Sequence, residues 1–435
     1  MNVLSDPTKR RWLAFAALAT AFLLVNLHRL STAVLSEQLT SDFGTTAAQL
    51  GALHASFFYI YAVIQIPTGV MADRYGPRYV GSGGAAVLSI AAIGFALADS
   101  YAVALLARAL IGTGSGVIFV SILRFSANWY RVDEFATMTG LTGAVAGLGA
   151  VLATTPLALT VEAVGWRQTM LGLGLVGLLV GIAVYAVARR SPADAGLEPI
   201  DNVPEQPPVT LRETGSYLRT LAGDPDQWLV SVTFFSTMGT LLTLIGLWGV
   251  PYLVVVYGLD VTTASYYTLL ASVGMLVGSP TVGRFSDATG HRLVPMVAGF
   301  GLFVLALAVI PAFGKPPLFV VAGSYFLCGF LFGAAMLGFS VLKERYPAGA
   351  SGVATAAVNT AGFVGGALFP TLMGAALDAY ATDEVVAGTA AYTEFGYRVA
   401  FGIITAVAAV AFLCSLWLLL RHRNTGADAA SPVGR

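Results

Sequence analysis

The chain has 435 residues, of which 57% are apolar and only 11% are charged, with 23 basic and 23 acidic side chains. An average soluble domain carries about 25% charged residues, so this composition excludes an ordinary water-soluble protein and indicates an integral membrane protein. The balanced charge gives no argument for nucleic-acid binding, and no basic block interrupts the sequence.

Twelve apolar runs are long enough to cross a bilayer as helices, which takes about 20 residues each. The first run is of full length and lacks a small-residue cleavage pattern, so we expect it to stay in the mature protein. The sequence therefore predicts an all-α integral membrane fold of twelve transmembrane helices, six in each half. The predicted spans are residues 12–35, 47–70, 78–98, 101–128, 136–160, 164–188, 227–256, 263–282, 293–313, 317–342, 351–376 and 396–420.

A polar, proline-rich stretch, SPADAGLEPIDNVPEQPP, divides the chain near its middle and cannot span a membrane. The following LRETGSYLRTLA has helical apolar spacing and predicts an interfacial helix. The predicted domains are an N-terminal six-helix bundle at 1–190, a cytoplasmic linker at 191–226, and a C-terminal bundle with its tail at 227–435.

The two halves repeat each other, as expected for an inverted or parallel pair of bundles. GVMADRYGPR at 69–78 reappears as VGRFSDATGHR at 282–292, and Pro156 and Pro370 keep the same spacing. GWRQTMLGLGLVG from Gly165 resembles GYRVAFGIITAVA from Gly396, with a wider spacing that a longer loop at 377–395 accounts for.

The basic residues predict the orientation in the membrane, because short cytoplasmic loops collect Lys and Arg. Three arginines fall inside apolar runs. Of the others, all but Arg167, Lys315 and Arg398 lie on the side that holds both termini. We therefore expect a multi-pass protein of the cell membrane with both termini in the cytoplasm.

The repeated loop motif resembles the cytoplasmic signature of the major facilitator superfamily. This resemblance implies a transporter whose two bundles rock around a central cavity. Glycines allow a tight reversal between helices, and an aspartate with arginines can form a charge-assisted latch in one access state. A generic positively charged turn is the alternative interpretation. The predicted gating residues are Gly69, Asp73, Arg74, Gly76 and Arg78, with Gly283, Asp287, Gly290 and Arg292.

RALIGTGSG at 108–116 resembles a second signature of the same superfamily, and its small residues allow close helix contact. Arg108 lies within this apolar run, where a charge is costly unless it is paired or faces water. Arg108 is therefore a predicted substrate-binding residue, and a structural hydrogen bond to backbone carbonyls is the equal alternative. Gly143, Gly147, Gly149 and Pro156 resemble the flexible gating helix of the superfamily, and plain packing explains any one of them equally well.

Arg29 matters most for the substrate, because the first span, VNLHRLSTAV, places a permanent charge within the membrane. Together with FFYIYAVIQIPTG at 57–69 and Arg124 before Trp129, it resembles the organic-anion and sugar-phosphate branches of the superfamily. Asn26 shares its helical face and His28 adjoins it. Snorkelling or helix capping near the outer interface is the alternative role for Arg29.

Two departures weaken the resemblance to those branches: His28 stands where many of those proteins have an aspartate, and residues 227–256 contain no arginine. The missing arginine favours a carboxylate over a phosphate ester with two charges, although Arg108 could supply a second positive group. Further predicted lining residues offer hydroxyl, amide or indole groups, although packing is an equally ordinary use of such side chains. They are Tyr59, Tyr61 and Gln65 in the first half, and Trp248, Tyr252 and Asn359 in the second.

An enzyme is not predicted, because no paired carboxylates within a span, Ser/His/Asp set or nucleotide-binding loop is present. Cys328 and Cys414 lie in apolar runs without metal-ligand spacing, so no metal and no cofactor are expected. Transport would be driven by symport or exchange. A proton is the possible coupling ion, with His28 and His54 as available switches or as ordinary hydrogen-bonded residues.

The sequence predicts a secondary transporter of a small organic anion, acting as a monomer in the lipid bilayer. Efflux of amphiphilic drugs, uptake of a neutral sugar, and a transporter-like receptor that senses a solute are the alternatives left open.

Overall fold

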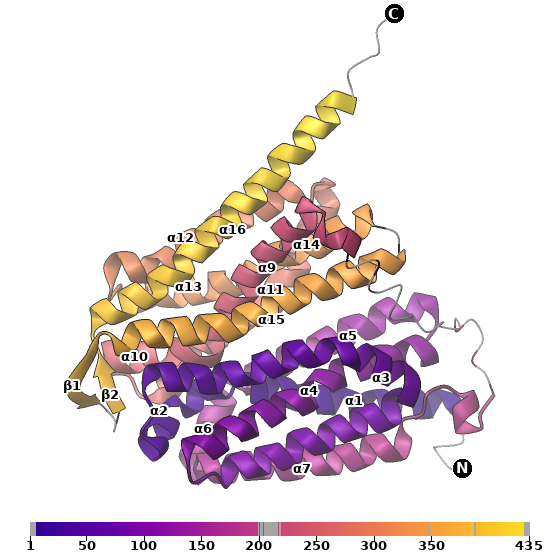
Figure 1. Ribbon diagram of the computed structural model, residues 1–435, viewed down its shortest axis with the longest axis horizontal. Helices are drawn as coiled ribbons and strands as arrows, with labels where there is room; N and C mark the ends of the chain where they lie inside the picture. Colours follow the sequence, from indigo (N-terminus) through magenta and orange to yellow (C-terminus); the bar gives the residue numbers. More distant parts are fainter. Residues whose placement is uncertain are drawn as a thin grey trace, which may run out of the picture.

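Figure 1 shows a helical molecule in which the helices of the first half lie in one group and those of the second half in another. The computed structural model describes residues 6–198, 200, 203, 216, 219–346, 348–386 and 389–429. Side chains are described for these residues except 65–67, 69, 70, 73, 132, 133, 135, 136, 139, 287, 343, 348–352, 383–386, 389–391 and 424–429.

The elements follow the predicted spans closely. The first half contains α1 (Pro7–Leu30), α2 (Thr32–Phe43), α3 (Ala47–Ala96), α4 (Tyr101–Trp129), α5 (Val132–Leu152), α6 (Thr155–Val164) and α7 (Trp166–Val187), followed by the short 3₁₀ helix η2 (Ala193–Ala195). The second half contains α9 (Pro225–Thr243), the π-helical turn η3 (Leu244–Trp248), α10 (Gly249–Tyr257), α11 (Val261–Thr289), α12 (Leu293–Phe313), α13 (Leu318–Phe330), α14 (Phe332–Arg345), α15 (Ala348–Asp378), β1 (Ala381–Val386), β2 (Thr389–Tyr392) and α16 (Glu394–Ala429).

Within the described residues, 11 helices are long and apolar enough to cross a membrane, and 12 if the bent pair in the fifth span counts as one. That pair, Gly140–Leu152 and Thr155–Val164, is bent by 44° just before Pro156. The twelve-helix, two-bundle fold is thus confirmed.

Glycines make the tight reversals of the repeated loop motif. Gly76 adopts φ 76° inside α3, and Gly290 adopts φ 68° directly after α11. Only glycine occupies this region of backbone conformation without strain. Each copy of the motif therefore turns the chain between two spans at the second of its two glycines.

Besides the bent fifth span, three predicted spans are not single continuous helices. The first is interrupted at Ser31, whose hydroxyl donates to the carbonyl of His28 at 3.0 Å. The seventh widens into η3, and the tenth is interrupted at Leu331. Such breaks leave backbone groups for side chains to satisfy, and π turns occur often at functional positions.

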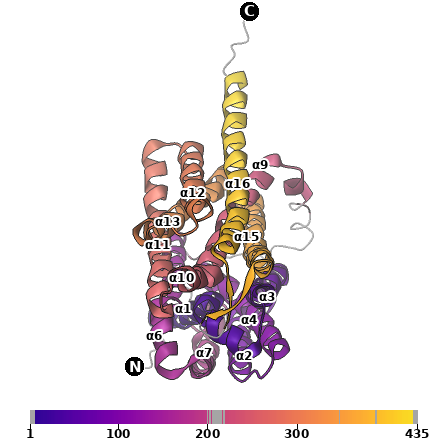
Figure 2. The same ribbon diagram turned by 90° about the vertical axis from the view of Figure 1, so that its left-hand side faces the viewer.

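The loop predicted at 377–395 contains a two-stranded antiparallel sheet, in which Ala381 pairs with Tyr392 and Val386 with Thr389. This hairpin lies beside α2 and α15 (Figure 2). The interfacial helix expected within 191–226 falls mostly outside the described residues.

The two halves meet closely at one end of the molecule and diverge toward the end that carries the N-terminus (Figure 1). We call the first of these the closed end; it comprises residues 44–51 and 155–165 of the first half and residues 258–265 and 370–378 of the second. Side-chain hydrogen bonds between described residues join the halves here. Thr262 donates to Glu162 at 2.8 Å, and Ser265 donates to Thr155 at 3.0 Å.

Candidate functional site

Arg29 lies one residue before the end of α1, and its side chain is only 8% exposed. Its guanidinium donates to the side-chain oxygen of Asn26, one helical turn earlier. Its Nε has no hydrogen-bond partner among the described residues. A buried cation without a counter-ion is unfavourable, so an anion bound beside Arg29 would stabilise this arrangement.

The second half contributes an aromatic ring to the same place. Phe363 of α15 lies with its ring centre 5.9 Å from the Arg29 guanidinium carbon and 4.5 Å from the ring of Tyr61 on α3. A cation over an aromatic face gains about 0.5–2 kcal/mol. Arg29, Tyr61 and Phe363 therefore connect the two halves at the centre, and we call these three residues the central triad.

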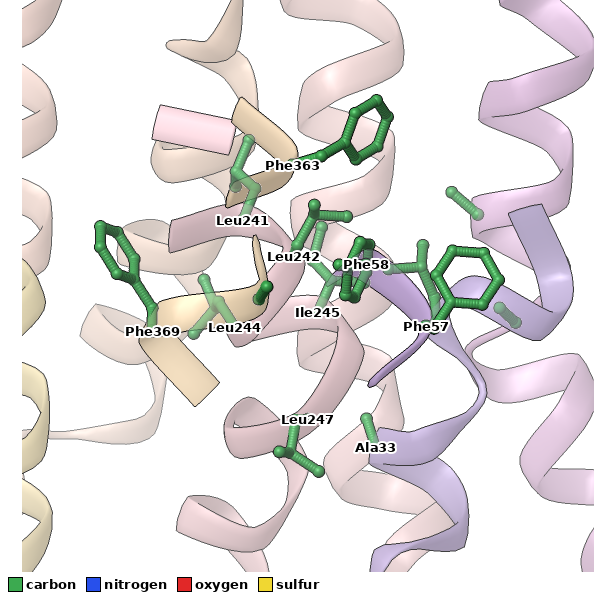
Figure 3. Packing of buried hydrophobic residues seen from close by; sticks show 14 of the residues in the cluster. Ala33, Phe57, Phe58, Leu241, Leu242, Leu244, Ile245, Leu247, Phe363 and Phe369 are labelled. Atoms are coloured by element: carbon green, nitrogen blue, oxygen red, sulfur yellow. The ribbon is translucent and has the colours of Figure 1, made fainter. Parts of the chain in front are cut away.

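Aromatic and aliphatic side chains surround the central triad. Phe58 stacks against Phe363 with centroids 6.3 Å apart. Figure 3 shows Phe58 beside Leu242 and Ile245 of the opposite half, with Ala33 and Leu247 further along. This apolar packing lowers the local dielectric and strengthens any charge interaction that Arg29 makes.

Arg108 occupies a different environment, although both arginines were predicted to bind the substrate. It is 1% exposed and donates to the carbonyl of His28 at 2.7 Å and to the hydroxyl of Thr32 at 2.8 Å. These acceptors lie on either side of the break at Ser31. Arg108 thus satisfies backbone left free by the break between α1 and α2, in agreement with the structural alternative considered for it. Direct contact with a solute stays a prediction.

The two histidines of the first half are both fully buried. Neither ring nitrogen of His28 has a hydrogen-bond partner among the described residues. The same holds for His54, whose ring centre lies 5.1 Å from that of Phe58. A Cβ added to Gly246 in η3 would lie 2.7 Å from His54, so the π turn approaches this ring as closely as glycine permits.

The remaining predicted lining residues are not brought together with the central triad by any described contact. Tyr59 is 46% exposed. The indole of Trp248 donates to the carbonyl of Pro370 at 3.0 Å, and the hydroxyl of Tyr252 donates to the carbonyl of Gly314 at 2.6 Å. Asn359 is half-buried on α15, one turn before Phe363. Arg124 is half-buried, and the side chain of Gln65 lies outside the described residues.

The predicted gating arginines lie at the end opposite the closed end. Arg78 lies with its guanidinium carbon 4.2 Å from the ring centre of Tyr185, and Arg74 lies 5.4 Å from that of Tyr75. Arg292 forms an ion pair with Glu344 at 3.1 Å. The side chains of Asp73 and Asp287 lie outside the described residues. For Gly69 only the helical backbone is described. Gly283 is within α11. The latch itself stays a prediction.

Sequence reasoning missed the ion pairs that stabilise the starts of α1 and α9. Glu134 accepts two bonds from Arg11 at 2.9 and 3.1 Å. In the second half, the fully buried Asp226 forms an ion pair with Arg345 at 2.7 Å, and its carboxylate lies 2.9 Å from Nε2 of His422. Acidic residues beside predicted span starts are the only signal in the sequence that could have indicated them. The described residues contain no group of His, Cys, Asp and Glu that could hold a metal ion.

Comparisons with known proteins agree with this architecture. A family model described as Major Facilitator Superfamily matches residues 13–370. The chain is 26% identical over 304 residues to a Cupriavidus necator protein named "Probable sulfoacetate transporter SauU", covering 68% of this chain and 70% of the relative. It is also 26% identical to "Probable nitrate/nitrite transporter NarK2" of Mycobacterium tuberculosis, covering 81% of this chain and 86% of the relative.

The fold is also similar to that of solved structures. A bacterial homologue of the human lysosomal transporter Spinster, in an inward-facing and occupied conformation, superimposes with a TM-score of 0.75 at 18% identity. The match covers 95% of this chain and 97% of that chain. At this identity the likeness shows the fold.

Proposed function

Because the chain belongs to the Major Facilitator Superfamily of transporters, we propose that it carries a small organic anion, of the carboxylate class, across the cell membrane by alternating access. The observation that carries this proposal is the buried Arg29 guanidinium at the junction of the halves, with an unpartnered Nε and no described carboxylate bonded to it. The names of the two relatives, which refer to sulfoacetate and to nitrate and nitrite, support an anionic solute.

The solute site in this proposal is the central triad. The planar guanidinium offers parallel N–H donors that match the two oxygens of a carboxylate. Tyr61 offers a hydroxyl, and Phe363 covers the site from the second half. A phosphate ester with two charges would need a second free cation, and Arg108 already bonds to His28 and Thr32. Both terminal nitrogens of Arg108 are thus occupied, whereas one terminal nitrogen of Arg29 bonds to Asn26, so Arg29 is the guanidinium better placed to take a singly charged head group.

The orientation follows from the distribution of basic residues. With both termini and the linker in the cytoplasm, the closed end faces outward and the halves diverge toward the cytoplasm. The described state is then inward-facing. The bundle boundaries at 190 and 227 belong to the same proposal. Rocking of the halves would separate the contacts of the closed end and close those near Asp73 and Asp287.

Counterflow in proteoliposomes tests the proposal. Vesicles are preloaded with one unlabelled compound and diluted into a trace of the same compound in labelled form. The compounds tested in turn are acetate, succinate, sulfoacetate, glucose 6-phosphate, glucose and a lipophilic cation. Transient accumulation of a carboxylate or sulfonate, and none of glucose or the cation, is the expected result. Accumulation of the lipophilic cation alone would refute the anion assignment in favour of drug efflux. Ligand-dependent thermal stabilisation without any counterflow would indicate a receptor.

A further inference from the structure

The carboxylate of Asp378, in the second half of the molecule, accepts hydrogen bonds from the first half. Asp378 is the last residue of α15, and its two oxygens accept hydrogen bonds from the backbone N–H of Ala47 at 2.7 Å and of Ala48 at 2.8 Å. These donors are the first two residues of α3, in the other half. Backbone N–H groups at a helix start have no partner within their own helix.

The start of α3 already has a cap of its own, which accounts for other donors. Thr46 accepts from the N–H of Gln49 at 3.2 Å, and the Gln49 side chain accepts from the N–H of Thr46 at 3.0 Å. The N–H groups of Ala47 and Ala48 are left over by this capping box. Asp378 fills that remainder, so the local sequence of α3 and the distant carboxylate together complete one helix start.

The helix dipoles make the Asp378 carboxylate more favourable when α15 contacts α3 than when the two helices are apart. A negative charge is unfavourable at the C-terminus of a helix and favourable at an N-terminus. Asp378 therefore opposes the dipole of α15 and complements that of α3. Separation of the two helices would leave the carboxylate in its unfavourable place and return the two N–H groups to water.

The surrounding backbone is fitted to the contact. A Cβ added to Gly374 would lie 2.4 Å from the carbonyl of Ala47, and one added to Gly51 would lie 2.5 Å from the carbonyl of Pro370. Glycines on both helices thus let the end of α15 approach the start of α3. The ring of Tyr392, at the end of the hairpin, lies 6.5 Å from the ring of Trp248.

We infer that Asp378 is a carboxylate latch, which holds the closed end shut by capping α3 of the opposite half. The structural part of this inference does not depend on the solute. Its role in a transport cycle rests on the proposed function, because opening the closed end must break both bonds of the latch.

The test measures opening directly in purified protein in detergent, with no solute added. In a background with Cys328→Ala and Cys414→Ser, the probe is Ser36→Cys, a nearly isosteric change at a side chain that is 6% exposed and lies against the second half near Trp248. The rate of maleimide labelling reports exposure of this surface. Asp378→Asn removes the charge and leaves one acceptor oxygen, with an NH₂ group facing the second N–H donor. We therefore expect labelling to accelerate about fivefold or more.

Two control variants separate opening from local damage. Asp42→Asn alters a carboxylate that bonds to Trp166 and Arg167 within the first half, and Thr46→Ala removes the cap that α3 supplies itself. Neither should change the labelling rate more than twofold. A second probe, Ser265→Cys, is fully buried at a separate contact with Thr155. Rigid opening of the halves exposes both probes.

An unchanged labelling rate at Ser36→Cys in the Asp378→Asn protein would overturn the inference. Acceleration at Ser36→Cys without acceleration at Ser265→Cys would also overturn it, because that pattern indicates fraying of α3 alone. If Asp378→Asn does not fold, Asp378→Ser also removes the charge and leaves one shorter capping oxygen, so it should accelerate labelling as well. None of these outcomes requires the anion proposal to hold, so the two can fail separately.

Discussion

Replacing Arg29 should weaken binding of the anion without lowering the stability of the solute-free protein, because the guanidinium makes few contacts with the protein. Arg29→Ala removes one bond to Asn26 and a contact with Phe363, but it also removes a buried charge that no described carboxylate balances. Such a charge costs several kcal/mol in a membrane interior. We therefore expect the melting temperature of the solute-free protein to stay the same or rise.

Binding of the anion should respond in the opposite direction. The Nε–H of Arg29 is available to a solute, and each hydrogen bond to a charged group contributes about 1.5–3 kcal/mol. Loss of one such bond at the lower limit weakens binding about tenfold, and loss of two weakens it about 100-fold or more. Arg29→Lys keeps the charge but loses the planar fork, so it should recover only part of the affinity.

The assay is a titration of thermal stability against the anion found by counterflow, with transport measured in parallel. Arg108→Ala is the contrasting variant, since it removes bonds to the His28 carbonyl and to Thr32, and it should lower the melting temperature without solute. Arg189→Ala, at the end of α7, is a control that changes a helix-capping arginine far from the centre. If Arg29→Ala and Arg29→Lys bind and carry the anion like wild type, Arg29 is structural and the proposed site is wrong.

Three further outcomes are expected. Cysteines introduced at Ile200 and Val385 should label from opposite sides of the membrane, and labelling of both from outside intact cells would contradict the proposed orientation. Asp73→Asn should reduce turnover much more than affinity, as measured by transport against solute concentration; normal transport at normal expression would exclude a latch there. Burial raises the pKa of Glu134, but bonds from Arg131 and Arg11 outweigh it and hold the pKa below its usual value. Glu134→Gln should therefore cost about 1 kcal/mol at pH 7, and this difference in thermal stability should vanish as pH falls from about 4.5 through the lowered folded pKa; a difference that persists at the lowest pH would contradict the ion-pair explanation.

The fold could be predicted from the sequence because membrane spans and the turns between them are specified by local sequence patterns. An apolar run of sufficient length predicts a spanning helix whatever it packs against. Gly76 and Gly290 were recognisable from the repeated motif, and their positive φ values follow from the turn that each makes. The break at Leu331 had no such signal, because the run is apolar on both sides and contains no proline there.

The site could be predicted only in part, since a buried arginine looks the same in the sequence whatever its partners are. Arg29 and Arg108 both stand in apolar runs, and the difference between them depends on which carbonyls and hydroxyls lie nearby. The acceptors of Arg108 are about 80 positions away in the chain. Phe363 was missed for the same reason: its meeting with Tyr61 and Arg29 is set by how α15 packs on α3. Pairing between halves is a property of packing and not of a motif.

The contacts across the closed end suit the alternating access that we propose. The Asp378 bonds and the bonds Thr262–Glu162 and Ser265–Thr155 contribute about 0.5–1.5 kcal/mol each. Their sum is a few kcal/mol, the same range that an anion gains from Arg29. A ligand shifts a conformational equilibrium only through a difference in its affinity for the two states. Arg29 and Phe363 come from opposite halves, so movement of the halves changes the distance between them and with it the enclosure of a bound anion. In the transport cycle that we propose, the central triad would supply the difference in affinity, and the modest strength of the closed end would make that difference sufficient.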